Sequence, residues 1–400
     1  MTKRPEAPFP LSRRGPRPLM LHLSLALMKS AHLTAESLNW KDVWPNCLNS
    51  AIPLDTRQTA NLFEDILKQD KALIAGVAAY RQADYVRTLT DPPTIWAEEE
   101  TRLLDYGGSG PRVLFVPSLV NRAYILDLMP EASMLRWLAG QGLHPFLLDW
   151  GWPGEVERRF SLTDYIAGRL ERALAALPGP VILAGYCMGG LLALAASLRD
   201  QSAGHRIAGL ALLATPWDFH AENPDIARMV ADMMPFMEGI MQVSNTLPID
   251  VLNTFFAMVD PYGVGEKYRN FSRQDKGTAR ARRFVAMEDW LADGVPLVAP
   301  VARETLTGWY GANITAKGQW RVAGLVIDPT QLTIPCFCAI PARDRLVPAA
   351  SAKALARRLS NVMVVEPQAG HIGMIAGTHA QSLLWQPFSA WAHGLSSGKS

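Results

Sequence analysis

The chain has 400 residues, of which 49% are hydrophobic and 19% are charged. This composition provides the apolar side chains of a covered central sheet and excludes an intrinsically disordered chain. The 39 basic and 37 acidic residues almost cancel, so the formal net charge is +2. Because no overall field attracts polyanions, we expect no nucleic-acid partner and no binding to an acidic membrane surface.

The first 95 residues are predicted to form an arm followed by a helical region. Residues 1–18 mix prolines, glycine and charges, which is typical of a flexible arm. The apolar run 19–28 follows basic residues, as in a signal peptide, but His22 interrupts it and no small-x-small cleavage site follows. We therefore favour an amphipathic helix within a helical region 19–95, and we expect no transmembrane segment.

From residue 96 onward, short apolar runs alternate with helical patterns, as in a parallel sheet covered by helices. The predicted core comprises residues 96–216 and 331–396. The long helical interval 217–330 between two core strands is predicted to be an inserted cap. The predicted strands are 113–116, 146–148, 181–184, 210–213, 336–340 and 363–365.

Methionines recur at i, i+4 spacing in the predicted cap, at Met229, Met233, Met237 and Met241. Pro235 lies inside this pattern and is expected to kink or break a helix there. Core packing is the favoured explanation of the pattern. The alternative is a flexible apolar lid over an acyl channel, because methionine adapts to varied apolar shapes.

Residues 185–190 read Gly-Tyr-Cys-Met-Gly-Gly and lie between an apolar strand and a helical pattern. This is the form of the nucleophile elbow Gly-x-Ser-x-Gly, with Cys187 in place of serine. Small residues let the strained turn pack, and the start of the helix favours a thiolate. The sequence therefore predicts an α/β-hydrolase fold, a mostly parallel sheet with helices on both faces, with Cys187 as the nucleophile.

An acid and a histidine follow the elbow in the chain order typical of this fold. Asp344 follows strand 336–340 and His371 follows strand 363–365, so both are expected at the carboxyl edge of the sheet. His371 is predicted to be the general base, and Asp344 is predicted to orient it. The alternative for Asp344 is an ordinary loop carboxylate. Asp328 is a less favoured acid because it precedes its strand, and the other histidines lie in helical or peripheral settings.

The oxyanion hole is predicted to combine the N–H of Met188 with one N–H from the loop after the first core strand. Val120 and Asn121 are the candidates in that loop. Asp149 and Trp150 end another strand at the same edge, where they either line the site or form a structural turn.

The cysteines are few and irregularly spaced, which argues against a disulfide framework and for a reducing, cytoplasmic location. Cys336 and Cys338 share one face of a predicted strand, but no further Cys/His pair has a spacing suited to a metal ion. We interpret both as core residues and expect no metal site. The four cysteines are Cys47, Cys187, Cys336 and Cys338.

These residues and several further motifs resemble the polyhydroxyalkanoate (PHA, including PHB) synthases, particularly those of class III. The resemblance implies that Cys187 carries the growing acyl chain, that His371 is the general base, and that Asp344 supports it or activates the substrate hydroxyl. It also implies an (R)-3-hydroxyacyl-CoA substrate, with CoA as the leaving group and no cofactor. The motifs are Val-Asn-Arg-Ala-Tyr-Ile-Leu-Asp-Leu (120–128), Leu-Leu-Asp-Trp-Gly (147–151), Asp-Tyr (164–165), the elbow (185–190), Met-Glu-Asp-Trp (287–290), Asp-Arg-Leu-Val-Pro (344–348) and Gly-His-Ile-Gly (370–373).

The same resemblance implies a growing polyester chain or granule as a partner, granule association in the cytoplasm, and either a homodimer or a partner subunit. Family members usually carry histidine after the triad aspartate, where this chain has Arg345. The helical N-terminal region also fits the family loosely. These departures leave open a hydrolase acting on hydroxyacyl thioesters or polyester, and a non-catalytic protein that coats granules. We rank the synthase first because a cysteine suits acyl transfer to an alcohol.

Overall fold

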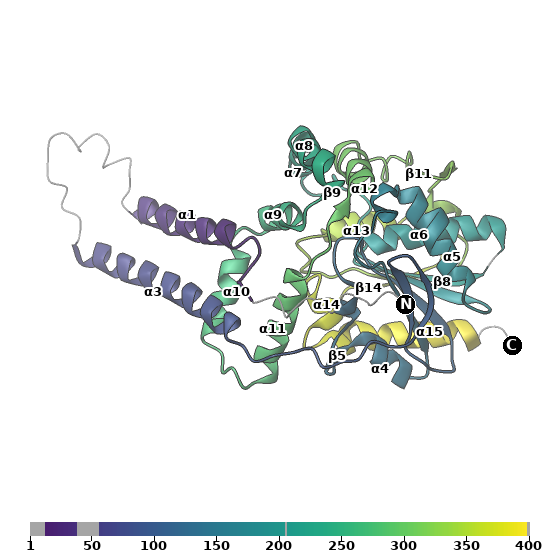
Figure 1. Ribbon diagram of the computed structural model, residues 1–400, viewed down its shortest axis with the longest axis horizontal. Helices are drawn as coiled ribbons and strands as arrows, with labels where there is room; N and C mark the ends of the chain where they lie inside the picture. The colour runs from purple at the N-terminus through teal and green to yellow at the C-terminus, as the bar shows by residue number, and fades with distance from the viewer. Residues whose placement is uncertain (1–12, 38–55, 205, 398–400) are drawn as a thin grey trace. The chain divides into compact units, whose positions relative to one another are not determined.

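The computed structural model describes residues 13–37, 56–204 and 206–397. Its largest element is an eight-stranded sheet with the order β1-β2-β6-β3-β7-β8-β13-β14 (Figure 1). The strands from β6 to β14 in this order run parallel to their neighbours, and β1 and β2 are antiparallel additions at one edge. The parallel part is the sheet that the alternating sequence pattern predicts.

Each predicted core strand is present, and its ends lie within three residues of the predicted ones. All of these strands except β13 are longer than predicted because flanking residues also pair. Arg112, for example, lies opposite His144 in the pairing of β3 with β6. The strands of the sheet are β1 (Thr94–Glu98), β2 (Thr101–Asp105), β3 (Arg112–Val116), β6 (His144–Asp149), β7 (Val181–Tyr186), β8 (Ile207–Leu213), β13 (Cys336–Ala339) and β14 (Val362–Val365).

The antiparallel pair β1 and β2 is absent from the sequence prediction. Its outer strand β1 is mostly exposed, so it has no buried apolar run. The inner strand β2 pairs with β6 and places Arg102 opposite Asp149. Helix α3 ends at Arg81 and β1 begins at Thr94, so the last residues of the predicted helical region 19–95 are not helical.

Helices cover both faces of the sheet, and Figure 1 shows α6 (Met188–Ala203) above it and α15 (Gln386–Ser397) below it. Phe388 of α15 packs against Phe115 of β3 and Phe337 of β13, with ring centroids 5.8 and 5.7 Å apart. The other helical elements of this part are η1 (Ala123–Leu126), α4 (Met134–Gly140), η2 (Glu157–Arg159), η3 (Asp164–Leu170), α5 (Glu171–Ala175), η5 (Pro329–Gln331), α13 (Ala349–Ala356), α14 (Gly373–Ala376) and η6 (Gln381–Trp385). A short pair, β4 (Asp127–Met129) and β5 (Ala132–Ser133), lies between η1 and α4.

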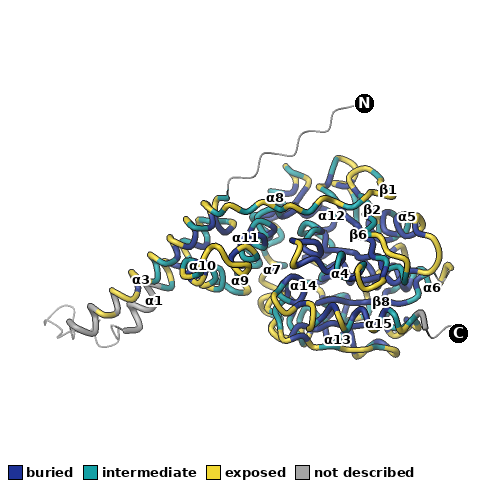
Figure 2. The backbone as a smooth tube through the Cα atoms, turned by 90° about the horizontal axis from the view of Figure 1, so that it is seen from below, coloured by how far each residue is buried: buried dark blue, intermediate teal, exposed yellow. Residues whose placement is uncertain are grey.

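The central strands are the most buried part of the sheet and appear dark blue in Figure 2. All six residues of β7 are buried, and the last four residues of β3 are also buried. Continuous apolar runs are expected for strands that are covered on both faces. The strand that leads to Cys187 is therefore fixed on both sides by packed side chains.

The interval between β8 and β13 is mainly helical, as predicted, and also contains two small antiparallel pairs, β9 with β10 and β11 with β12. Its elements are α7 (Pro224–Asp232), α8 (Met234–Ser244), β9 (Thr246–Leu247), α9 (Ile249–Val259), α10 (Gly263–Ser272), α11 (Ala279–Ala292), β10 (Leu297–Val298), α12 (Ala299–Arg303), η4 (Glu304–Gly311), β11 (Arg321–Val322) and β12 (Leu325–Val326).

Pro235 divides the methionine pattern between two helices, because α7 ends before Met233 and α8 begins at Met234. Met237 and Met241 are completely buried, whereas Met229 is 45% exposed. The four side chains therefore do not form one continuous stripe. The burial of Met237 and Met241 favours core packing over a flexible lid for these two positions.

The chain forms two compact units, 1–86 with 253–292 and 87–252 with 293–400. The predicted cap 217–330 is thus divided between them. In the first unit, α1 (Leu19–Ser37) and α3 (Thr56–Arg81) share a core with α10 and α11. Tyr80 and Tyr268 meet edge to face in that core, with centroids 5.8 Å apart.

The end of the predicted flexible arm is held in the first unit. Arg13 donates to both carboxylate oxygens of Asp289 at 2.7 Å, and the Tyr80 hydroxyl donates to the same carboxylate at 2.9 Å. Residues 1–12 of the predicted arm and Cys47 lie outside the described residues. Of the helices in the described ranges, none is long and apolar enough to cross a membrane.

Candidate active site

Cys187 lies in the sharp turn between β7 and α6, as the elbow motif predicts. Its backbone angles are φ 56° and ψ −127°, in a region that non-glycine residues rarely adopt. The Cys187 N–H donates to Leu213 O at 2.8 Å, and its carbonyl accepts from the Gly190 N–H at 2.9 Å. These bonds and the buried strand before it hold the strained turn, and the thiol is half-buried.

The glycines of the motif are required because neighbouring atoms leave no room for a Cβ. A Cβ at Gly189 would stand 2.1 Å from Val116 O, and a Cβ at Gly185 would stand 2.4 Å from the Gly190 Cα. A Cβ at Gly190 would stand 1.9 Å from Thr215 Oγ1. The start of α6 therefore packs directly on the ends of β3 and β8, which fixes the position of Cys187 relative to the sheet.

Asp344 and His371 meet at the carboxyl edge of the sheet. His371 Nδ1 lies 2.7 Å from Asp344 Oδ2, and the Asp344 side chain is fully buried. The other oxygen of Asp344 accepts from the N–H groups of Leu346 and Val347 at 2.9 and 3.0 Å. The loops that carry the two residues are also joined, because Arg343 N–H donates to Ala369 O at 3.0 Å.

The alternative acid, Asp328, occupies a different kind of position. It caps η5 through the Thr330 N–H at 3.1 Å and lies 3.8 Å from Arg358. Two of the other histidines also have structural partners, since His144 lies 2.7 Å from Asp105 and His220 lies 2.6 Å from Tyr310 O. None of these contacts involves Cys187.

The His371 imidazole also interacts electrostatically with the Cys187 thiol. Burial alone would lower the pKa of His371, but the interaction with Cys187 and the bond to Asp344 raise it to about 10. An imidazolium is therefore favoured at neutral pH, which places a positive charge beside the Cys187 side chain. The site thus brings together a thiol, an imidazole and a buried carboxylate.

The other described cysteines have a different environment. Cys336 and Cys338 are buried in β13, and desolvation raises the pKa of Cys336 to about 12 and also raises that of Cys338. Such thiols are protonated at neutral pH and react slowly. Within the described residues, no group of three or more His, Cys, Asp or Glu side chains is arranged to hold a metal ion.

The candidates for the oxyanion hole differ in how their N–H groups are used. Met188 is the first residue of α6, where a helix leaves its N–H groups without intrahelical partners. The Val120 N–H donates to the Ser118 hydroxyl at 3.2 Å, and the Val120 carbonyl accepts from Val295 at 3.0 Å. The Val120 N–H is therefore already used within its own loop.

Trp150 holds the loop after β3, whereas Asp149 pairs with β2. The Trp150 indole N–H donates to Pro117 O at 3.0 Å, and Asp149 accepts from Arg102 at 2.7 Å. This observation favours a structural role for the pair. A small pocket beside Arg122, with a volume of about 380 Å³ that includes space open to solvent, is lined in part by Arg102 and Asp149.

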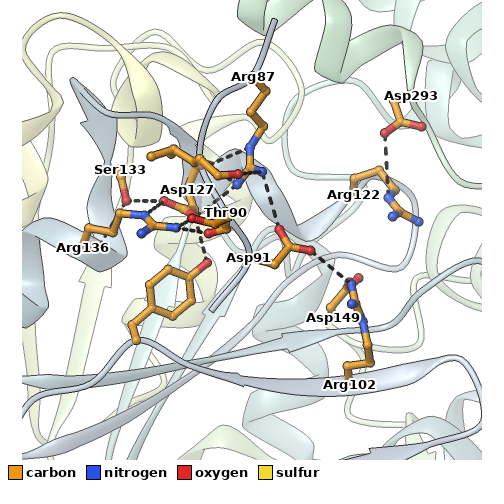
Figure 3. A network of polar contacts seen from close by, with 12 residues as sticks. Arg87, Thr90, Asp91, Arg102, Arg122, Asp127, Ser133, Arg136, Asp149 and Asp293 are labelled. Atoms are coloured by element: carbon orange, nitrogen blue, oxygen red, sulfur yellow. Dashed lines mark hydrogen bonds and ion pairs between the residues drawn. The ribbon is translucent and has the colours of Figure 1, made fainter. Parts of the chain in front are cut away.

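A buried carboxylate, Asp127, holds the chain just after this loop, as Figure 3 shows. It accepts from the Ser133 hydroxyl at 2.6 Å, from Arg136 at 2.8 and 3.0 Å, and from Arg87 at 3.2 Å. Sequence reasoning placed Asp127 in a family motif without assigning it a role. Its partners lie in other segments, so only the folded chain shows its function as an anchor.

The chain matches a known protein family and is similar to solved structures. The model of the alpha/beta hydrolase family matches residues 113–381, which is more than half of the chain. The chain belongs to this family, and the predicted fold class is confirmed. Among solved structures, a monoacylglycerol lipase from Paleococcus ferrophilus aligns with 74% of this chain and 99% of that chain, at 12% identity and a TM-score of 0.47.

Within the family, the chain is similar to poly(3-hydroxyalkanoate) polymerase subunits, which confirms the resemblance read from the motifs. The subunit of Allochromatium vinosum is 25% identical over 355 residues, which cover 85% of this chain and 98% of the relative. The Synechocystis subunit is 29% identical over 304 residues, covering 70% and 76%. The Haloferax mediterranei subunit is 25% identical over 316 residues, covering 76% of this chain and 63% of the relative, so this chain spans less than two thirds of it.

Proposed function

We propose that this chain polymerises (R)-3-hydroxyacyl groups from CoA into a polyhydroxyalkanoate, with Cys187 as the covalent acyl carrier. One observation carries the proposal. Cys187 occupies a strained elbow and interacts electrostatically with His371, which Asp344 holds at 2.7 Å, in a chain whose relatives are named poly(3-hydroxyalkanoate) polymerases. These are the elements of nucleophilic acyl transfer.

In the first half of the proposed reaction, the Cys187 thiolate attacks the thioester carbonyl of the hydroxyacyl-CoA. The N–H groups of Met188 and Asn121 stabilise the oxyanion that forms. The carbon–sulfur bond to CoA then breaks, and the His371 imidazolium gives its proton to the CoA thiolate. Cys187 now carries the acyl group as a thioester, and His371 is neutral.

In the second half, His371 accepts the proton of an incoming hydroxyl group while the oxygen attacks the acyl thioester on Cys187. An ester bond forms, the bond to Cys187 breaks, and the thiolate–imidazolium pair is restored. Asp344 keeps the His371 ring in place in both halves. Exchange of one thioester for another changes the free energy little, whereas transfer to a hydroxyl is downhill, so a cysteine suits this sequence of steps.

The proposal is tested by incubating the purified chain with (R)-3-hydroxybutyryl-CoA and measuring both free CoA and polyester. We expect CoA release together with polymer. CoA release with free 3-hydroxybutyrate as the only other product would instead establish a hydrolase, the alternative suggested by Arg345 in place of the usual histidine. No CoA release at all would favour a non-catalytic granule protein.

The assembly and location belong to the same proposal. Because the relatives are named as subunits, we propose that the chain works with a second chain, either another copy or a different subunit, at the surface of a polyester granule in the cytoplasm. Sedimentation of the active protein should show a species larger than one chain. An active monomer, with and without substrate, would contradict this part of the proposal.

A further inference from the structure

Tyr186 precedes Cys187 and contacts two parts of His371. It is the last residue of β7 and is only 4% exposed. Its ring lies 5.1 Å from the His371 ring, between centroids, with the planes tilted by 32°. Its hydroxyl donates to the His371 carbonyl at 3.3 Å. One side chain therefore contacts both the imidazole and the loop that carries it.

The contact completes the restraint of the imidazole. The bond from Nδ1 to Asp344 holds one atom of the ring, but a single hydrogen bond leaves the ring some rotation about its Cβ–Cγ bond. A side chain packed against the ring face restricts this rotation. The tilt of the ring decides whether Nε2 points to the thiol, so the restraint bears on proton transfer.

The ring of Tyr186 also bears on the charge of His371. The negative face of an aromatic ring stabilises a nearby cation. The titratable groups that face His371 are Cys187, Asp344 and Tyr186, and Tyr310 lies near Cys187. Burial, together with the charges of Cys187 and Asp344, raises the pKa of Tyr186 well above its usual value, so the phenol stays neutral and carries no proton in the reaction.

We propose that Tyr186 is a positioning residue for His371, with its ring supporting the imidazolium and its hydroxyl holding the loop. The inference deepens the proposed function, because it assigns a further residue to the same site. Tyr186 acts through His371 and does not touch the substrate. Neither Gly-x-Cys-x-Gly spacing nor composition indicates this role, since the partner is far away in the sequence.

The test separates the ring of Tyr186 from its hydroxyl by comparing Tyr186→Leu with Tyr186→Phe. The readout is the rate of Cys187 alkylation by iodoacetamide as a function of pH, which needs no substrate. We expect Tyr186→Leu to raise the midpoint of this profile by about 0.5–1 pH unit, because the imidazolium and hence the thiolate are less stable. Tyr186→Phe keeps the ring and should leave the midpoint unchanged.

Turnover provides the second readout. Tyr186→Leu should lower kcat for CoA release roughly tenfold with little change in KM, because the binding of substrate is untouched. Tyr186→Phe should lower kcat by about threefold or less. Tyr80→Phe is a matched control, because Tyr80 is another buried tyrosine whose hydroxyl donates to a carboxylate, Asp289 at 2.9 Å, and it belongs to the first compact unit. It should change neither readout.

A wild-type alkylation midpoint in folded Tyr186→Leu protein would overturn the proposal. If that variant does not fold, pentafluorophenylalanine at position 186 keeps the size of the ring but removes its negative face. Its midpoint should lie above that of Tyr186→Phe, and equal midpoints would overturn the proposal. Since alkylation is measured without CoA, a failure of the proposed polymerase activity leaves this test intact.

Discussion

Cys187 and Cys336 are both cysteines of the hydrolase core, yet their surroundings give them opposite chemistry. Cys187 is half-buried and lies beside the His371 imidazolium, whereas burial raises the pKa of Cys336 to about 12. We expect this cationic partner to favour a thiolate on Cys187 at neutral pH. The two thiols differ because Cys187 lies in the elbow and Cys336 lies inside a buried strand, since both residues are cysteines.

Iodoacetamide should therefore alkylate Cys187 selectively. With the pKa of His371 raised to about 10, the imidazolium persists through neutral pH and is lost only as the pH rises through about 10. Alkylation of Cys187 should thus be rapid at pH 7, and His371→Ala should slow it at least tenfold. Peptide mapping measures the result, with Cys336 as the internal control. Equal labelling of both cysteines at pH 7 is incompatible with this account.

Asp127 shows how one buried charge holds a functional loop. Removing it with Asp127→Ala takes an acceptor from Arg87, Arg136 and the Ser133 hydroxyl, although both arginines are partly exposed and Arg87 keeps Asp91 at 3.5 Å. We expect a loss of roughly 1–3 kcal/mol in the free energy of unfolding, because buried donors lose their partner. Urea unfolding measures this quantity. Asp225→Ala is the control, because Asp225 pairs with Arg228 at an exposed site and its loss should change stability by less than about 0.5 kcal/mol.

At the scale of elements, the contact between α6 and the ends of β3 and β8 positions the nucleophile. Gly189→Ala would place a Cβ 2.1 Å from Val116 O, so the helix must shift away from the sheet. We expect a loss of about 1–3 kcal/mol and reduced alkylation of Cys187. Gly394→Ala in α15 is the matched control, because its Cβ meets nothing within 4 Å. That change should be neutral or stabilise the helix by about 0.5–1 kcal/mol.

The elements differ in how far the sequence predicts them. The elbow is local, since an apolar strand, a glycine-flanked cysteine and a helical pattern follow one another directly. Strand β1 has no such pattern, because it is mostly exposed and exists through its pairing with β2. The contact of Tyr186 with His371 joins residues 185 positions apart, and local pattern cannot reveal it.

At the scale of the whole molecule, the sequence predicts the parallel sheet but not the division of the chain into two compact units. Residues 253–292 belong to the same compact unit as α3, although they lie in the middle of the predicted cap. This grouping arises from long-range packing, such as Tyr268 against Tyr80, and not from a boundary in composition. The predicted acid and base come together because both follow parallel strands, whose carboxyl ends share one edge.

The central claim is that Cys187 carries the acyl group, and trapping that group tests it most directly. The protein is mixed with (R)-3-hydroxybutyryl-CoA, quenched in acid within one turnover and digested for mass spectrometry. The account predicts a hydroxybutyryl thioester on the peptide that contains Cys187, absent in Cys187→Ala and retained in Cys336→Ala. Acylation of another residue, or CoA release by Cys187→Ala at the wild-type rate, would contradict it.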